Sequence, residues 1–371
     1  MESAINSRFP NLDGLRFLAS IFVVINHTEQ ISGILGLDNY FSLRGIEQIG
    51  KFGVMLFFSL SGFLITYLLI KEKEVTGSIN IKAFYLRRIL RIWPLYILIV
   101  LMALFFFHYI PLFDLNNGVK SIFFDNLGLK LLFYLVMLPN LVLIVFGGIP
   151  YASQTWSIGS EEQFYVIWPV ILKWMRITII SLLCIILFYH IFLYFFQNYV
   201  RSNIYREYCI ALIQTVPIDL MALGGIVAVI VYHKNYAFQI LDRIFNQMWF
   251  RGILIVVLFF LMLTGYRFPQ FNYLFYGVIM SALIFLLTRG KSYKILESRW
   301  LTFGGKISYG IYMWHAPIVT MVLKFLMLLG VQSKILSYPL ILLVTIFTAW
   351  LSFRFLETPF LRLKKNYTII T

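Results

Sequence analysis

Long apolar runs recur along the whole chain, and they limit the fold more than any other feature. A nearly uncharged stretch of about 18 or more residues is long enough to cross a bilayer as a helix. Only 13% of the residues are charged, whereas soluble domains have about 25%. The sequence therefore predicts an all-α, polytopic membrane protein. The apolar runs lie at residues 12–31, 52–70, 89–110, 129–147, 163–175, 177–197, 208–232, 250–266, 271–288, 308–330 and 336–353.

Basic residues predict which connections face the cytoplasm. Residues 71–91, residues 288–306 and the tail from Arg362 carry more basic than acidic residues. Because Lys and Arg are retained on the cytoplasmic side, we expect both termini in the cytoplasm. The run at 163–175 is short and contains Pro169, so we expect about ten crossings. We then expect residues 129–160 to be partly re-entrant or to lie at an interface, with an enclosed cavity near residues 147–162.

The net charge and the spacing of the cysteines bear on whether the chain binds nucleic acid or a metal. In a soluble protein the net charge of +15 would suggest binding to nucleic acid. Here most of the basic residues lie in short segments between apolar runs, where they set the membrane topology, and part of the excess is available for an anionic ligand. Cys184 and Cys209 lie in apolar surroundings without the spacing of a metal site. We therefore expect the lipid bilayer as a partner, and neither nucleic acid nor a metal.

The first apolar run contains ionisable residues. At 100° per residue, Asp13, Arg16, Ser20 and His27 lie on one helix face, and Asp13 and Arg16 are close enough to pair. Ionisable groups inside a membrane are costly, so such a stripe indicates function. His27 can accept a proton near physiological pH. The alternatives are that Asp13 caps the helix and Arg16 extends to the membrane surface.

For an arginine cluster and one further carboxylate, the spacing in the sequence does not decide the role. Arg88 and Arg91 share a helix face and are able to grip one phosphate-bearing ligand, but with Arg87 they would serve equally well as a cytoplasmic anchor. Asp219 lies within an apolar run, where a carboxylate indicates function, although its partner is not readable from the sequence.

Six segments together resemble the integral membrane acyltransferase family three. They occur in the family's order: LDGLRFLASIFVVINH (12–27), GVMLFFSLSGFLIT (53–66), FYLRRILRIWPLY (84–96), TWSIGSEEQFYVIWP (155–169), ISYGIYMWHAPI (307–318) and RFLETPF (354–360). Members of this family O-acylate cell-surface polysaccharides, lipopolysaccharide O-antigens, peptidoglycan and some antibiotics. Some carry an additional C-terminal extracellular domain, for which we expect no room, so residues 1–371 are predicted to form one integral membrane domain.

The resemblance implies a set of site residues. It assigns the acyl-CoA donor, most simply acetyl-CoA, to Arg87, Arg88 and Arg91, because the family's arginine pair is implicated in handling that donor. Its acidic position corresponds to Glu161, which we expect to orient His27 or to bind the acceptor.

Four uncharged or aromatic positions and one further histidine complete the set. Ser59 and Ser61 either donate hydrogen bonds to the thioester or are small residues that allow close helix packing. Trp156 and Tyr165 suit sugar recognition. His315 is either a second imidazole of the site or a structural residue.

We therefore predict a membrane O-acyltransferase of the bacterial cytoplasmic membrane. It would move an acyl group from cytoplasmic acyl-CoA to a hydroxyl of a cell-surface or exported glycan, with His27 as the base and with Asp13, Arg16 and Glu161 around it. The donor would extend from the arginines along the first helix, over about 16 Å between Arg16 and His27. The alternatives are a transporter or flippase for an anionic or lipid-linked glycan, and a structural subunit of an envelope complex.

Overall fold

The computed structural model describes residues 9–115, 125–268, 272–290, 292–364 and 367. Within these ranges the chain is helical and forms no strand, which confirms the prediction of an all-α membrane bundle. The helices are α1 (Leu12–Ile34), α2 (Arg44–Thr76), α3 (Ile81–Phe105), α5 (Leu127–Leu135), α6 (Pro139–Phe146), α7 (Trp156–Trp174), α8 (Ile179–Asn198), α9 (Ile204–Thr215), α10 (Ile218–His233), α11 (Tyr236–Asn246), α12 (Met248–Thr264), α13 (Asn272–Thr288), α14 (Arg299–Lys306), α15 (Ser308–Leu328), α16 (Lys334–Ser352) and α17 (Thr358–Lys364).

Several helices are long and apolar enough to cross a bilayer. Six such spans lie within the described residues, and α11 with α12, which meet at 83°, would make a seventh if they form one broken span. α13 has only 17 residues, and α1 and α7 carry charged side chains among their apolar residues. The chain is thus a multi-pass membrane protein, and the number of ten crossings stays a prediction.

Residues 129–160 do not form one long helix. α5 and α6 have 9 and 8 residues, which at about 1.5 Å per residue is too short to cross a bilayer. A turn at Met137, whose φ is 59°, separates them, and Gly147 and Gly148 follow α6 with φ of 76° and 83°. The expected interruption of the helical pattern is therefore present.

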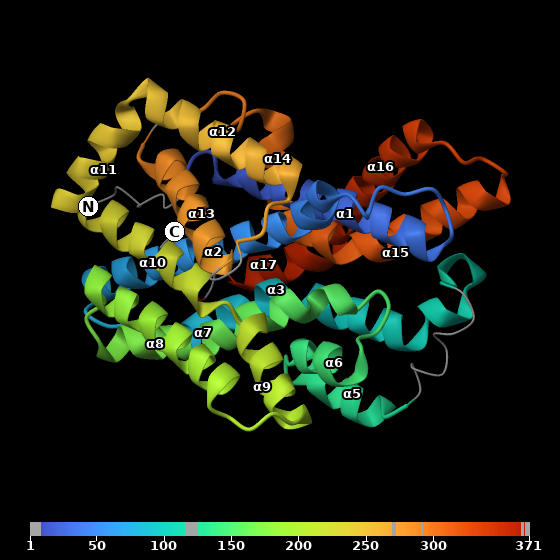
Figure 1. The fold of residues 1–371 in the computed structure, drawn as a ribbon, viewed down its shortest axis with the longest axis horizontal. Coiled ribbons are helices and arrows are strands. Elements are labelled where there is room, and N and C mark those ends of the chain that lie inside the picture. The colour runs from blue at the N-terminus through green and yellow to red at the C-terminus, as the bar shows by residue number, and fades with distance from the viewer. Residues whose placement is uncertain (1–8, 116–124, 269–271, 291, 365–366, 368–371) are drawn as a thin grey trace.

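Helix α2 occupies the centre of the bundle. It contacts α1, α7, α10, α12 and α13, and Figure 1 shows α11, α12 and α13 on one side of it and α3, α7 and α8 on the other. The crossing with α10 is very close: a Cβ atom on Gly62 would lie 1.9 Å from the carbonyl oxygen of Met221, and one on Gly224 2.0 Å from that of Ser59. Glycine at these positions lets the two backbones touch, as is common between membrane helices.

Both ends of α1 are fixed by tight contacts. At its start, a Cβ on Gly305 of α14 would lie 2.1 Å from the carbonyl oxygen of Asp13. Near its end, the carboxylate of Glu29 is almost fully buried. It accepts hydrogen bonds from the Lys334 ammonium at 3.0 Å, from the Tyr338 hydroxyl at 2.5 Å and from the backbone N–H of Tyr40. These contacts hold the polar face of α1 in a defined position.

Candidate active site

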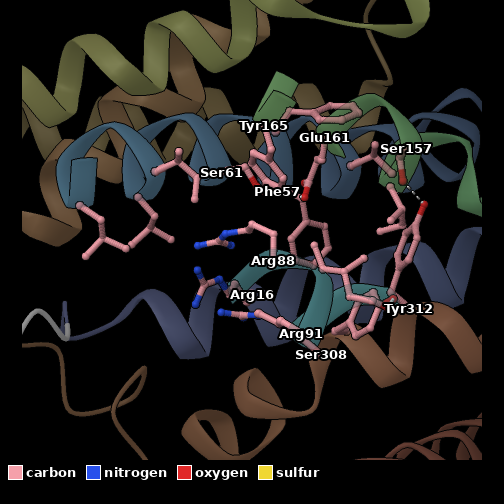
Figure 2. Close-up of a pocket in the computed structure, with 18 residues that line it drawn as sticks. Arg16, Phe57, Ser61, Arg88, Arg91, Ser157, Glu161, Tyr165, Ser308 and Tyr312 are labelled. Atoms are coloured by element: carbon pink, nitrogen blue, oxygen red, sulfur yellow. Dashed lines mark hydrogen bonds between the residues drawn. The ribbon is translucent and has the colours of Figure 1, made fainter. Parts of the chain in front are cut away.

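Side chains from α1, α2, α3, α7 and α15 line a cavity of about 250 Å³, here called the arginine cavity. Figure 2 shows the guanidinium groups of Arg16, Arg88 and Arg91 lying together, with Glu161 and Tyr165 nearby. Arg91 is exposed, whereas Arg16 and Arg88 are half-buried. The rest of the lining is mainly apolar. This is a cavity with a cationic end and an apolar interior.

Hydrogen bonds leave part of the positive charge unpaired. Tyr165 Oη donates to Glu161 Oε2 at 2.9 Å and lies 3.0 Å from Ser61 Oγ. Arg16 Nη1 lies 3.6 Å from Asp13 Oδ1, as the sequence predicted. The Arg88 guanidinium stacks over the Tyr165 ring at 5.3 Å, and its Nε has no hydrogen-bond partner among the described residues. Three guanidinium groups against one lining carboxylate favour an anionic ligand.

A second cavity, of about 470 Å³ and here called the histidine cavity, lies toward the other end of α1. Its lining includes His27, the amide side chains of Gln30 and Gln154, and the aromatic rings of Trp156 and Tyr273. Aromatic faces combined with amide groups are the surfaces that suit polar ligands with an apolar face, such as sugars. His27 therefore faces a cavity and not lipid.

His27 lies beside a second imidazole. The ring centroids of His27 and His315 are 4.8 Å apart, with the ring planes at 55°. His315 is fully buried, and its Nδ1 lies 2.5 Å from the carbonyl oxygen of Tyr312. The side chain of Gln30 is a hydrogen-bonding neighbour of His27. A bare imidazole nitrogen in this cavity is suited to accept a proton from a hydroxyl group.

Pro317 interrupts the backbone hydrogen bonds of α15 close to His315. Proline has no N–H, so the carbonyl of Met313 loses its usual partner in the helix. That carbonyl accepts instead a hydrogen bond from Gln154 Nε2 at 3.2 Å, and Gln154 belongs to the turn η3 (Ser153–Thr155). The contact attaches the segment before α7 to the helix that carries His315.

Three side chains lie where the two cavities meet. Among the described residues, those that line both cavities are Val54, Phe58 and Tyr312, and we call these three residues the partition. Phe58 is 2% exposed. The Tyr312 hydroxyl donates to the Gln154 carbonyl oxygen at 2.9 Å and lies 2.7 Å from Ser157 Oγ, which Figure 2 marks by a dashed line. The arginines and His27 thus line different cavities, which meet at these three side chains.

Most of the predicted site residues line one of the two cavities. Those in the lining of the arginine cavity are Arg16, Ser61, Arg88, Arg91, Glu161 and Tyr165. His27 and Trp156 line the histidine cavity. Tyr165, predicted beside Trp156 for sugar recognition, is thus on the arginine side of the partition. Glu161 is likewise separated from His27, whose close neighbour is His315.

Four predicted residues lie outside both linings, and one of them, His315, packs beside His27. Arg87 pairs with Glu72 at 2.9 Å and donates to the Tyr367 carbonyl oxygen. Ser59 is fully buried at the crossing of α2 with α10, which agrees with the packing alternative. Asp13 is absent from the lining but pairs with Arg16, which lines the arginine cavity.

Some contacts had no signal in the sequence. Asp219 is paired with His190, whose Nε2 lies 3.4 Å from Asp219 Oδ2. Gln30 and Gln154 were not singled out, because an amide in an apolar run has no spacing rule that marks it as part of a site. Their roles depend on which helices pack together.

The architecture defines an integral membrane protein with a buried site between a cationic and an imidazole-bearing cavity. Comparison with known families identifies its class: the chain belongs to the acyltransferase family, whose model, described as an acyltransferase domain, matches residues 9–354. This confirms the resemblance noted from the sequence. No solved structure is significantly similar to the chain.

The chain is also similar to curated bacterial proteins. It is 30% identical to the peptidoglycan O-acetyltransferase OatA of Listeria monocytogenes, over 96% of this chain and 56% of that protein. It is 27% identical to the O-acetyltransferase OatA of Staphylococcus aureus strain NCTC 8325, over 97% of this chain and 58% of that protein. A putative O-acetyltransferase of S. aureus strain COL is 26% identical over 95% and 57%. The chain thus spans a little more than half the length of these relatives.

Proposed function

We propose that this protein is a membrane O-acyltransferase that takes its donor in the arginine cavity and its hydroxyl acceptor in the histidine cavity. The observation that carries this proposal is the partition: Val54, Phe58 and Tyr312 lie between a cationic cavity and one that contains His27. Membership of the acyltransferase family supports the reaction class. The activity of the Listeria relative, a peptidoglycan O-acetyltransferase, favours acetyl as the acyl group and a glycan such as peptidoglycan as the acceptor.

The proposed donor is acyl-CoA from the cytoplasm. Its phosphates would bind Arg88, Arg91 and Arg16, because guanidinium groups form paired hydrogen bonds with phosphate oxygens. The unpartnered Nε of Arg88 supports this assignment. The uncharged pantetheine arm would lie along the apolar lining and bring the thioester to the partition. This orientation puts the arginine cavity and both termini on the cytoplasmic side of a bacterial cytoplasmic membrane.

The proposed chemistry is acyl transfer assisted by a general base. His27 removes the proton of an acceptor hydroxyl, whose oxygen attacks the thioester carbonyl. The carbon–oxygen ester bond forms, the carbon–sulfur bond breaks, and the proton held by His27 neutralises the departing thiolate. The side chains of the partition must move for the reacting atoms to meet, because His27 and the arginines line different cavities.

The proposal is tested by measuring release of free thiol from acetyl-CoA by the purified protein in the presence of a glycan acceptor. An acyltransferase releases thiol in step with acceptor acylation, and His27→Ala abolishes both. A transporter or a structural subunit releases none. Full turnover by His27→Ala would remove this residue from the mechanism.

Donor binding is tested by Arg88→Ala. Loss of charged hydrogen bonds is expected to raise the KM for acyl-CoA by about 10- to 150-fold, the equivalent of about 1.5–3 kcal/mol. Arg87→Ala is the matched control, because Arg87 lies in the same helix but pairs with Glu72 outside the cavity. Equal increases in KM for the two variants would contradict the assignment of the donor to this cavity.

A further inference from the structure

We propose that His315 is a positioning residue that fixes which nitrogen of His27 carries the hydrogen. This inference rests on the proposed function, in which His27 is the general base. It assigns to His315 the task of keeping one nitrogen of His27 bare and available to the acceptor hydroxyl.

The hydrogen-bond partner of His315 determines its own tautomer. Its Nδ1 lies 2.5 Å from the carbonyl oxygen of Tyr312. A carbonyl oxygen only accepts, so Nδ1 must carry a hydrogen. In the neutral ring the other nitrogen, Nε2, is then an acceptor with an exposed lone pair. This Nε2 has no hydrogen-bond partner among the described residues, although the side chain is fully buried.

The ring of His27 is the group placed to satisfy that lone pair. With the ring centroids 4.8 Å apart, a nitrogen of His27 comes within hydrogen-bonding distance of His315 Nε2 when the two nitrogens face each other. A buried acceptor left unsatisfied is costly, so the tautomer of His27 that points an N–H at His315 is favoured. The remaining nitrogen of His27 is then bare.

This arrangement replaces the carboxylate that commonly orients a catalytic histidine. Glu161, the predicted partner, lies in the arginine cavity and accepts a hydrogen bond from Tyr165. Gln30 is the side-chain hydrogen-bonding neighbour of His27, and its amide group carries both a donor and an acceptor, so an acceptor hydroxyl takes its place when it bonds to the bare nitrogen. The Tyr312 carbonyl, the His315 ring and the His27 ring thus form a chain in which each donor has one acceptor.

Spectroscopy on the wild-type protein tests the premise without an activity measurement. The protein is labelled with ¹⁵N at its five histidines, and signals are assigned from His27→Gln and His315→Gln spectra. We expect His315 to carry its hydrogen on Nδ1 and His27 to show one dominant tautomer, which becomes mixed in His315→Ala. A His315 with its hydrogen on Nε2, or an unchanged His27 signal in His315→Ala, would overturn the proposal.

Kinetics test the consequence. His315→Ala is expected to lower kcat by about 100-fold, within the range that general-base catalysis contributes, with KM for acyl-CoA unchanged. His315→Gln, whose amide oxygen is able to accept near the former Nε2, should recover most of that loss. His190→Gln is the control, because His190 is a partly buried histidine that lines neither cavity.

The outcomes separate this inference from the proposed function. Wild-type protein without thiol release would defeat the proposed function, while the ¹⁵N spectra would still decide the tautomer of His27. Normal turnover by wild type together with equal kcat for wild type and His315→Ala would defeat only the positioning role. A rise in KM without a fall in kcat, or an equal loss in His190→Gln, would also refute it.

Discussion

Replacement of Phe58 by alanine should open the partition between the two cavities. Phe58 is 2% exposed and lines both cavities, and its ring lies 6.0 Å from that of Trp156. Removal of the phenyl ring leaves a gap larger than the volume of about 30 Å³ that a water molecule occupies. Water on the His27 side then gains access to the thioester, so we expect hydrolysis of acyl-CoA in the absence of acceptor.

The same substitution should reduce stability. Truncation of a buried phenylalanine to alanine costs about 3–5 kcal/mol, because the neighbouring atoms fill the gap only in part. Phe63 is a matched control in the same helix: it is fully buried, packs against the rings of Phe9 and Tyr67, and lines neither cavity. Phe63→Ala should therefore lose a similar amount of stability without opening the partition.

The assay combines thermal unfolding of the purified variants with thiol release from acetyl-CoA in the absence and presence of acceptor. Both variants should unfold at a lower temperature than wild type, and only Phe58→Ala should show an increased rate without acceptor. An equal increase in Phe63→Ala would show that general loosening causes the hydrolysis. A folded Phe58→Ala with no increase would refute the role of Phe58 as a barrier.

Two further substitutions test what holds the bundle together. Gly62→Ala would force α2 and α10 apart and should lower the free energy of unfolding by at least about 1–3 kcal/mol. The control is Gly252→Ala, which has nothing near its added Cβ and should be neutral or stabilising in thermal unfolding. Equal effects of the two substitutions would contradict the close crossing. Glu29→Gln should lower stability by about 1–3 kcal/mol, because it leaves the Lys334 ammonium without its carboxylate. Lys51→Met, which removes an exposed ion pair, should cost less than about 1 kcal/mol, and a larger loss than in Glu29→Gln would contradict the ranking.

Helical periodicity and hydropathy predicted most of the fold. The runs at 12–31, 177–197 and 308–330 correspond closely to α1, α8 and α15. The run predicted at 163–175 starts later than the helix that contains it, because α7 begins at Trp156. The first turns of α7 carry polar side chains that face the arginine cavity or other helices, and a hydropathy pattern does not mark inward-facing polar residues as part of a membrane helix.

Local patterns on one helix were predicted more successfully than contacts between helices. The pairing of Asp13 with Arg16 followed from their spacing on α1. The approach of His315 to His27 did not, because it depends on how α15 packs against α1. The partition was missed for the same reason: Val54 and Phe58 read as ordinary apolar residues until α2 is placed beside Tyr312.

The position of the partition between the two cavities also has an electrical consequence. In the proposed orientation, the two cavities approach each other from opposite faces of the membrane, and when water fills them the transmembrane voltage falls mainly across Val54, Phe58 and Tyr312. An elementary charge that crosses a full drop of about 100 mV gains or loses about 2.3 kcal/mol. An acyl group is uncharged and would cross this steep field without electrical work, while the anionic part of its carrier stays with the arginines.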